Sequence, residues 1–346
     1  MNRRSFAGFV APSVLAMLLL ILLPLLGTAW LSLHESYVKT ELAEVQTSVP
    51  LFGGMSRVEV RRVPQAVRDA AGIPVRVWNF VGLDNYANVL SLDRLRQALV
   101  TLSDATPGWG WQFYRDVTSI EFWGALEFSL LYIAATTPCV LLLGFAIALA
   151  VDATSRRVRG ALIFASLLPF IITPVVGALS IYWLFLDNAV VNAALQGLGF
   201  AKFYFLSGAV PIRALIVLYG VWHATPFAFV VLYAGLQTLP QDALEAALVD
   251  GATAWQRLRF VIVPHLAPLF AFVGLIHVMD AYRVFEPVLV FGSNLYANSL
   301  QYMTYRILNS EDNYSKAAAA SLLTVLGIVV LLIPILRRLW RERQAA

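Results

Sequence analysis

The chain has 346 residues, of which 59% are hydrophobic and only 13% are charged, about half the charged share of an ordinary soluble domain. This composition excludes an ordinary soluble protein and predicts a chain that lipid surrounds along much of its length. The net charge of +4 is too small to indicate a nucleic-acid partner, and the single cysteine, Cys139, excludes an intrachain disulfide and a paired-cysteine zinc site.

The N-terminal segment predicts an uncleaved membrane helix. No charged residue lies in the stretch 5–33, and Arg3 and Arg4 precede it. The apolar core of a secretory signal is only about 7–15 residues long, which is much shorter than this run. We therefore expect a first span near residues 9–31 and treat residues 1–33 as the N-terminal transmembrane domain.

Residues 34–121 are the long polar stretch of the chain, and we expect them to form a small extracytoplasmic lobe. The nine basic and ten acidic residues of this stretch nearly cancel. Apolar and polar residues alternate over 56–63, which predicts a β-strand, and 73–80 shows a similar pattern. Two strands alone are marginally stable, so we expect the lobe to lean on the membrane domain or on a partner.

Five further apolar runs are each long enough to cross a bilayer, which takes about 20 residues. With the first span they predict an all-α membrane protein of six transmembrane helices, the last five forming a core over residues 122–346. These runs cover residues 122–151, 161–186, 209–236, 265–291 and 316–336.

Arginines in the short loops predict the orientation of these spans, because positive residues concentrate on the cytoplasmic side. If the N-terminus lies inside, almost all short-loop arginines fall in the cytoplasm. We therefore expect both termini to be cytoplasmic. The arginines concerned are Arg3, Arg4, Arg156, Arg157, Arg159, Arg257, Arg259, Arg337, Arg338, Arg341 and Arg343.

A polar, helix-forming insert at residues 239–264 separates the fourth and fifth runs. Asp242 suits the first turn of a helix, and Gly251 lies where that helix should end in a left-handed conformation. Thr253 can cap a second short helix, and Pro264 marks the entry to the fifth span. We expect a helix, a sharp break and another helix on the cytoplasmic face.

This insert resembles the cytoplasmic coupling motif of ABC importer permeases. Five residues match that motif at the family spacing, and Asp250 beside Gly251 is typical of the carbohydrate-uptake members, of the maltose-permease type. The segments Phe80–Tyr86 and Phe122–Leu130 resemble stretches found around the second span of those permeases. The five matching residues are Glu245, Ala246, Ala247, Gly251 and Pro264.

The resemblance implies a permease subunit of an ATP-driven importer in a bacterial inner membrane. Such a subunit works with a second permease as a heterodimer, two ATPase subunits and an extracytoplasmic solute-binding protein that delivers a carbohydrate. The insert at 239–264 would dock on the ATPase, which would bind the ATP and Mg²⁺, so this chain would bind no cofactor. Glu245 would pair with a basic group of the ATPase, and the small Ala246 and Ala247 would allow close approach.

Four polar residues in the fifth run are candidates for the solute pathway. His277, Asp280, Arg283 and Glu286 follow each other in steps of three, which places them on one broad helix face. Charges at this depth usually face a cavity or each other. They could therefore line a sugar pathway or form a self-satisfied ladder that pins helices together. Two aromatic residues, Trp222 and Tyr282, are further candidates for contact with a sugar ring, although tryptophan is common as packing.

No motif for catalysis occurs in the sequence. The P-loop needs a lysine after glycine, and none of Lys39, Lys202 and Lys316 follows one. We therefore expect no catalytic or metal-binding residue. The alternative function is a proton-coupled secondary transporter that uses the polar face of the fifth span, and a membrane enzyme is a third possibility without a supporting motif.

Overall fold

The computed structural model describes residues 3–50, 56–69, 71–101, 109–292 and 296–345. The chain folds as two compact units. The first joins Met1–Leu90 to Arg306–Leu323, and the second joins Ser91–Tyr305 to Thr324–Ala346. The domain limits predicted at residues 33 and 121 concern membrane crossing rather than compactness, and they stay a prediction.

The first unit begins with one long apolar helix. It consists of α1 (Arg3–Met17), a π-helical turn η1 (Leu18–Leu22) and α2 (Leu23–Ser32). The π-helical turn precedes Pro24, which has no N–H to donate, and Leu23 N–H donates five residues back to the Leu18 carbonyl. The stretch Val10–Ser32 is long and apolar enough to cross a membrane, as predicted for residues 9–31.

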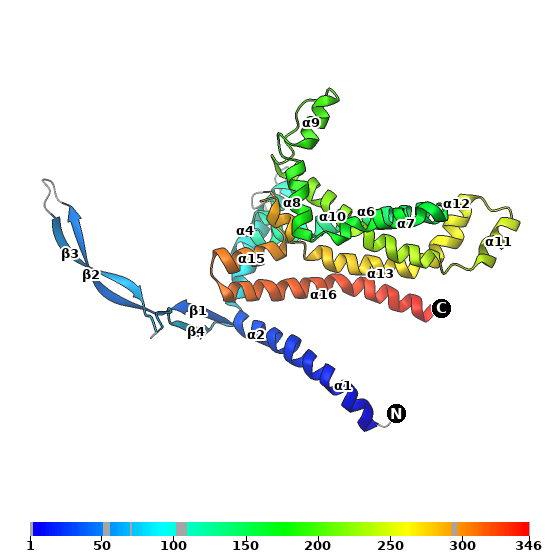
Figure 1. Ribbon diagram of the computed structural model, residues 1–346. Coiled ribbons are helices and arrows are strands. Elements are labelled where there is room, and N and C mark those ends of the chain that lie inside the picture. The colour runs from blue at the N-terminus through cyan, green and yellow to red at the C-terminus, as the bar shows by residue number, and fades with distance from the viewer. Residues whose placement is uncertain (1–2, 51–55, 70, 102–108, 293–295, 346) are drawn as a thin grey trace. The chain divides into compact units, whose positions relative to one another are not determined.

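Two antiparallel sheets of two strands follow. β1 (His34–Val38) pairs with β4 (Arg76–Phe80), and β2 (Thr40–Pro50) pairs with β3 (Ser56–Ala66) as a long ribbon (Figure 1). A strand therefore forms over each predicted stretch, although β4 begins only after Pro74, which cannot donate to a ladder. The partner strands β1 and β2 are missing from the sequence-based prediction.

Helix α3 (Asp84–Leu90) ties this lobe to the end of the first membrane helix. The buried Asn85 donates through Nδ2 to the carbonyls of Ser32, at 2.9 Å, and His34, at 3.1 Å. The Tyr86 hydroxyl lies 2.7 Å from Ser32 Oγ. Because the last carbonyls of a helix lack intrahelical donors, the Asn85 side chain acts as a cap for α2, and Tyr86 holds the Ser32 side chain.

A second contact joins the lobe to the start of α16 (Tyr314–Ala345) within the first unit. Arg76 on β4 forms an ion pair with Asp312 at 2.6 Å, and its guanidinium lies 4.8 Å from the centre of the Tyr314 ring. Since two-stranded sheets are marginal alone, this anchoring stabilises β1 and β4. The expectation that the lobe leans on the membrane domain or on a partner stays a prediction.

The second unit is built around three packed helices, α6 (Glu121–Asp152), α10 (Ala209–Leu236) and α13 (Val263–Tyr282). Figure 1 shows them side by side. Small residues allow the backbones to approach closely, as is usual between membrane helices. A Cβ placed on Gly144 of α6 would lie 2.6 Å from Ala228 Cβ and 2.9 Å from the Phe229 nitrogen of α10.

The third predicted span is not one straight helix. Residues 161–186 fall on α7 (Arg156–Ile171) and α8 (Pro174–Leu184), which are bent by 95° at the break between them. Pro174 explains the break, because a proline pushes the preceding residue out of helical geometry, and Thr173 is extended at φ −60°, ψ 141°.

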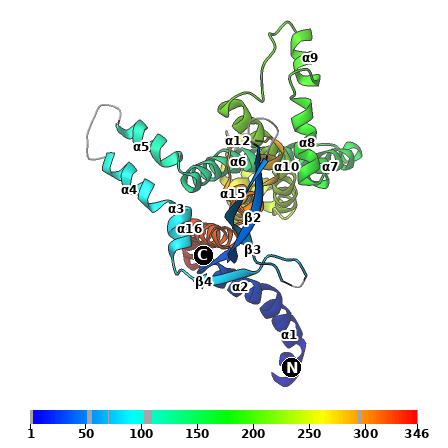
Figure 2. The same cartoon turned by 90° about the vertical axis from the view of Figure 1, so that its left-hand side faces the viewer.

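The described residues contain five helices that could each cross a membrane, or six if the bent pair α7–α8 is one span. The count of six therefore stays a prediction, while the helical membrane fold is clear. Figure 2 shows two amphipathic helices lying together before α6, and they are α4 (Leu92–Thr101) and α5 (Trp109–Thr118). The remaining helices are α9 (Val190–Gly197), α11 (Gln241–Val249), α12 (Ala254–Arg257), α14 (Glu286–Val290) and α15 (Leu300–Ser310).

We predict that Gly144→Ala destabilises the second unit, because the new methyl group would meet the backbone of α10, which cannot move aside. Overpacking of this kind costs about 1–3 kcal/mol. The matched control is Gly160→Ala, since a Cβ on Gly160 in α7 meets nothing within 4 Å. The measurement is the thermal unfolding midpoint of both purified variants in the same detergent. Equal midpoints would show that the contact between α6 and α10 is looser than described.

Candidate functional site

The predicted coupling segment is a pair of helices joined by a tight turn. α11 ends at Val249, and two N–H groups beyond Asp250 close the turn. Gly251 donates to the Leu248 carbonyl (3.0 Å), and Ala252 donates to the Ala247 carbonyl (2.9 Å). This is the Schellman arrangement, which places a residue in the left-handed region. Gly251 has φ 74°, so the position favours glycine as the sequence predicts.

The second helix of the segment begins at a capping box. Thr253 Oγ1 accepts from the Gln256 N–H, and Gln256 Oε1 accepts from the Thr253 N–H at 2.7 Å. The expectation that this second helix is short is wrong. It continues through the π-helical turn η3 (Leu258–Ile262) into α13, because the wider turn lets the chain pass Pro264, which has no N–H of its own.

The outer surface of this segment carries several apolar side chains. Val249 is 88% exposed, Phe260 is 68% exposed and Trp255 is 67% exposed. The motif residues Glu245, Ala246, Asp250, Gly251 and Pro264 are also exposed, while Ala247 is half-buried. Clustered exposed apolar side chains at a polar rim indicate a surface that binds another protein.

The base of the segment is tied to neighbouring helices. Gln237, just after α10, donates to Asp152 Oδ1 at the end of α6 (2.8 Å), and Thr238 lies 3.2 Å from His265 Nε2 on α13. Displacement of the segment therefore acts on α6, α10 and α13 together.

A second feature of this unit is a cavity of about 640 Å³, within the range of small-ligand sites. Tyr132 and Tyr219 in its wall lie about 15 Å from the starts of α6 and α10 at the helical rise per residue, so the cavity lies well inside the length of both helices. It is lined by Tyr132, Phe170, Pro174, Tyr219, Gly220, His223, Ala224, Phe227, Ile276, His277, Asp280, Ala281, Arg283, Val284, Phe285, Glu286, Pro287 and Gln301.

Four of the predicted pathway residues line this cavity, namely His277, Asp280, Arg283 and Glu286. The prediction that they lie on one helix face is wrong, however, since α13 ends at Tyr282 and Glu286 begins the separate helix α14. The break still turns Glu286 toward the same cavity. Asp280 and Arg283 form an ion pair at 3.3 Å, so one of the ion pairs expected for a self-satisfied ladder is present.

The two aromatic candidates do not line the cavity. Tyr282 is 2% exposed, and its hydroxyl lies against Gly327 of α16, where a Cβ would collide with it. Trp222 packs beside Tyr219, with ring centres 6.1 Å apart. The helix α10 runs without interruption through Trp222 and Pro226.

His277 is held in one tautomer by its neighbours. Thr136 Oγ1 donates its only proton to the Tyr132 carbonyl at 2.8 Å, and His277 Nε2 lies 3.0 Å from the same Oγ1. The Thr136 oxygen must therefore accept the second bond, so Nε2 carries the imidazole proton. This bond pins α13 to α6 beside the cavity.

Sequence reasoning missed several cavity residues. Tyr219 donates to the Pro174 carbonyl at 2.7 Å, and His223 Nδ1 lies 3.0 Å from the Pro169 carbonyl. Their rings are stacked with centres 5.6 Å apart. These bonds hold the bend between α7 and α8 against α10. Nothing in the local sequence separates such aromatics from core residues.

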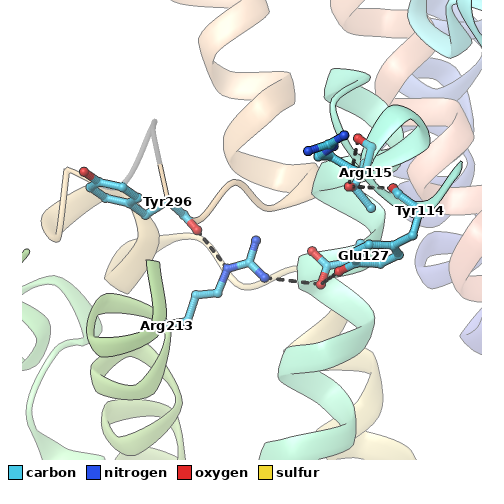
Figure 3. Close-up of polar contacts among 6 residues, drawn as sticks. Tyr114, Arg115, Glu127, Arg213 and Tyr296 are labelled. Atoms are coloured by element: carbon cyan, nitrogen blue, oxygen red, sulfur yellow. Dashed lines mark hydrogen bonds and ion pairs between the residues drawn. The ribbon is translucent and has the colours of Figure 1, made fainter. Parts of the chain in front are cut away.

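A polar cluster near the starts of α6 and α10 was also missed (Figure 3). Arg213 forms an ion pair with Glu127 at 3.2 Å and donates to the Tyr296 carbonyl at 2.8 Å. Tyr114 donates to the same Glu127 at 3.1 Å. Partial burial raises the pKa of the Tyr114 phenol, and the Glu127 carboxylate raises it further. The cluster joins α5, α6 and α10 to the chain after α14.

Comparison with known proteins places the chain among transport components. Residues 125–342 match the family model described as binding-protein-dependent transport system inner membrane component. A probable ABC transporter permease of Pyrococcus horikoshii is 34% identical over 75% of this chain and 86% of its own length. The trehalose transport system permease SugA of Mycobacterium tuberculosis is 31% identical over 84% of this chain and 92% of its own length.

The fold is also that of solved transporters. The crystal structure of a bacterial alginate ABC transporter, in complex with alginate pentasaccharide-bound periplasmic protein, contains a chain with a TM-score of 0.56 at 24% identity. The match covers 62% of this chain and 77% of that one. The relatives are permease components of transport systems rather than enzymes. The chain therefore belongs to the family of binding-protein-dependent transport system inner membrane components.

Proposed function

We propose that the chain is the membrane-spanning permease subunit of an ATP-driven ABC importer, which it couples to a separate ATPase through residues 239–264. The observation that carries the proposal is the exposed apolar surface of α11 and α12 around the Gly251 turn. A monomeric protein rarely leaves such a surface open. Glu245 provides a polar anchor beside it, and the small Ala246 and Ala247 let another subunit approach.

The structure offers a direct path from this surface to the cavity. One helix runs without a break from Ala254 through η3 and α13 to Tyr282. Trp255 near its start is exposed, whereas His277 and Asp280 near its end line the cavity. Because a helix is stiff along its axis, a push on the coupling segment shifts the cavity wall, which supports alternating access.

The solute we propose is a sugar or sugar-like molecule. Several relatives carry trehalose, maltose or diacetylchitobiose in their names. The cavity suits this class, since it combines aromatic faces at Phe170 and Phe285 with polar groups at Asp280, Glu286 and Gln301. Aromatic rings with a few placed hydrogen-bonding groups are typical of small-ligand sites.

The remaining parts of the assembly follow from the family. We propose a heterodimer with a second permease, two ATPase subunits that bind the ATP and Mg²⁺, and an extracytoplasmic solute-binding protein. The chain would cross the inner membrane of a bacterial cell several times, with both termini in the cytoplasm. No cofactor is assigned to this chain. The proton-coupled alternative would use the cavity carboxylates but gives the 239–264 segment no role.

We predict that β3 and the coupling segment lie on opposite sides of the membrane. With Cys139→Ser as background, Gln65→Cys should react with an impermeant maleimide from outside, and Val249→Cys only after the membrane is permeabilised. Both positions are exposed, so folding does not shield either. Labelling of both from the same side would contradict the topology and with it the coupling role.

We predict that Gly251→Ala uncouples the transporter. The left-handed conformation costs an L-residue about 1–2 kcal/mol, and the change lies on the surface proposed to meet the ATPase. Glu245→Ala should act in the same direction by removing the polar anchor. The measurement is ATP hydrolysis stimulated by the binding protein, with the amount of co-purified ATPase.

The matched control for this experiment is Gly199→Ala. Gly199 ends α9 in the same kind of turn, has φ 87° and meets nothing within 4 Å. The backbone cost is therefore similar, but the position is remote in sequence from the coupling segment. Equal loss of coupling in both variants would show a general stability effect and would remove the support for a docking role at Gly251.

A further inference from the structure

The cavity carries a surplus of negative charge. Asp280 and Arg283 form a partly exposed ion pair at 3.3 Å, so their charges cancel within the cavity wall. Glu286 also lines the cavity, and its carboxylate makes no hydrogen bond or ion pair with any part of the chain that the structure describes. A half-buried carboxylate without a partner is costly to remove from water, which indicates that Glu286 meets its partner in a bound solute.

Two side chains of the wall, Tyr219 and His223, can only accept further hydrogen bonds. The Tyr219 hydroxyl gives its proton to the Pro174 carbonyl. A carbonyl cannot donate, so His223 Nδ1 must carry the proton in its contact with Pro169. The neutral imidazole then has only a lone pair left on Nε2. With Glu286, these groups make the wall rich in acceptors.

The donors of the same wall are partly committed. The Arg283 Nη2 donates to Asp280 Oδ1, which leaves the other N–H groups of this guanidinium free within the described chain, and His277 Nε2 is bonded to Thr136. Gln301 and the Tyr132 hydroxyl are neutral donors among the lining residues. Because Glu286 adds a negative charge that no described cation of the wall neutralises, a solute that offers O–H or N–H groups fits this wall better than one that bears a carboxylate.

We propose that the cavity selects an uncharged or amine-bearing carbohydrate and rejects one that bears a carboxylate, with Glu286 as the residue that sets this charge preference. The inference rests on the proposed function, because it assumes that the cavity receives the solute. It separates this chain from its structural relative, a bacterial ABC transporter involved in the import of the acidic polysaccharide alginate.

The test uses three probes that differ only at C6 of glucose: methyl 6-amino-6-deoxyglucoside, methyl glucoside and methyl glucuronide. The complete transporter complex is reconstituted in nanodiscs without binding protein, and Cys139→Ser removes the native thiol. Gln301→Cys then places one thiol in the cavity wall. The slowing of its maleimide reaction with rising probe concentration gives the apparent Kd of each probe.

We expect the amine to bind at least as well as the neutral glucoside, and the glucuronide to bind about tenfold more weakly, which corresponds to about 1.4 kcal/mol. Glu286→Gln should narrow the gap between amine and glucuronide to less than about threefold. The control Glu35→Gln makes the same chemical change at an exposed site of the lobe and should leave the order unchanged.

Two results would overturn the charge preference: equal protection by glucuronide and glucoside, or an unchanged order in Glu286→Gln. If no probe protects the thiol while the complex still imports sugar with ATP, the cavity is not the solute site. The charge preference then fails, while the proposed permease function stands. Loss of ATP dependence would instead defeat the proposed function.

Discussion

Hydrocarbon offers no hydrogen-bond partner to a peptide group, so a chain within it must satisfy its own backbone. Long helices meet this constraint in both units, and the backbone accommodates their prolines in two ways. Pro24 and Pro264 each follow a π-helical turn, whereas Pro174 begins a new helix after a 95° bend. The bend exposes backbone carbonyls, and Tyr219 and His223 satisfy two of them. The cavity forms where these side chains meet α13.

The helices α6, α10 and α13 are packed so closely that a displacement of one would move the others. Gly144 lets α6 touch α10, and a Cβ at Gly220 would collide with the Tyr132 hydroxyl. At one end of the frame, Gln237 and Thr238 join the coupling segment to α6 and α13. At the other end, Arg213 joins α6, α10 and the chain at Tyr296. Tightly packed interiors transmit strain rather than absorb it, which supports the proposed transmission of movement from residues 239–264 to the cavity.

The sequence predicts what depends on neighbouring residues and fails where distant segments meet. Long apolar runs indicate membrane helices because lipid demands them, and the Gly251 turn and the Thr253 cap follow from local backbone chemistry. Cavity membership depends on packing instead. Nothing in the local sequence distinguishes Tyr282 from Tyr219, yet Tyr282 is buried against Gly327 and Tyr219 lines the cavity. The break after Tyr282, which carries Glu286 onto α14, has no clear local signal either.

Solute uptake by reconstituted proteoliposomes tests the coupling of this chain to ATP most directly. The vesicles carry the chain with its second permease, its ATPase subunits and its binding protein, and a panel of radiolabelled neutral disaccharides is offered. Uptake that requires ATP on the ATPase side and persists when a protonophore collapses the proton gradient is the predicted result. Uptake that follows an imposed proton gradient without ATP would contradict it, and would assign the carboxylates of Asp280 and Glu286 to proton coupling instead.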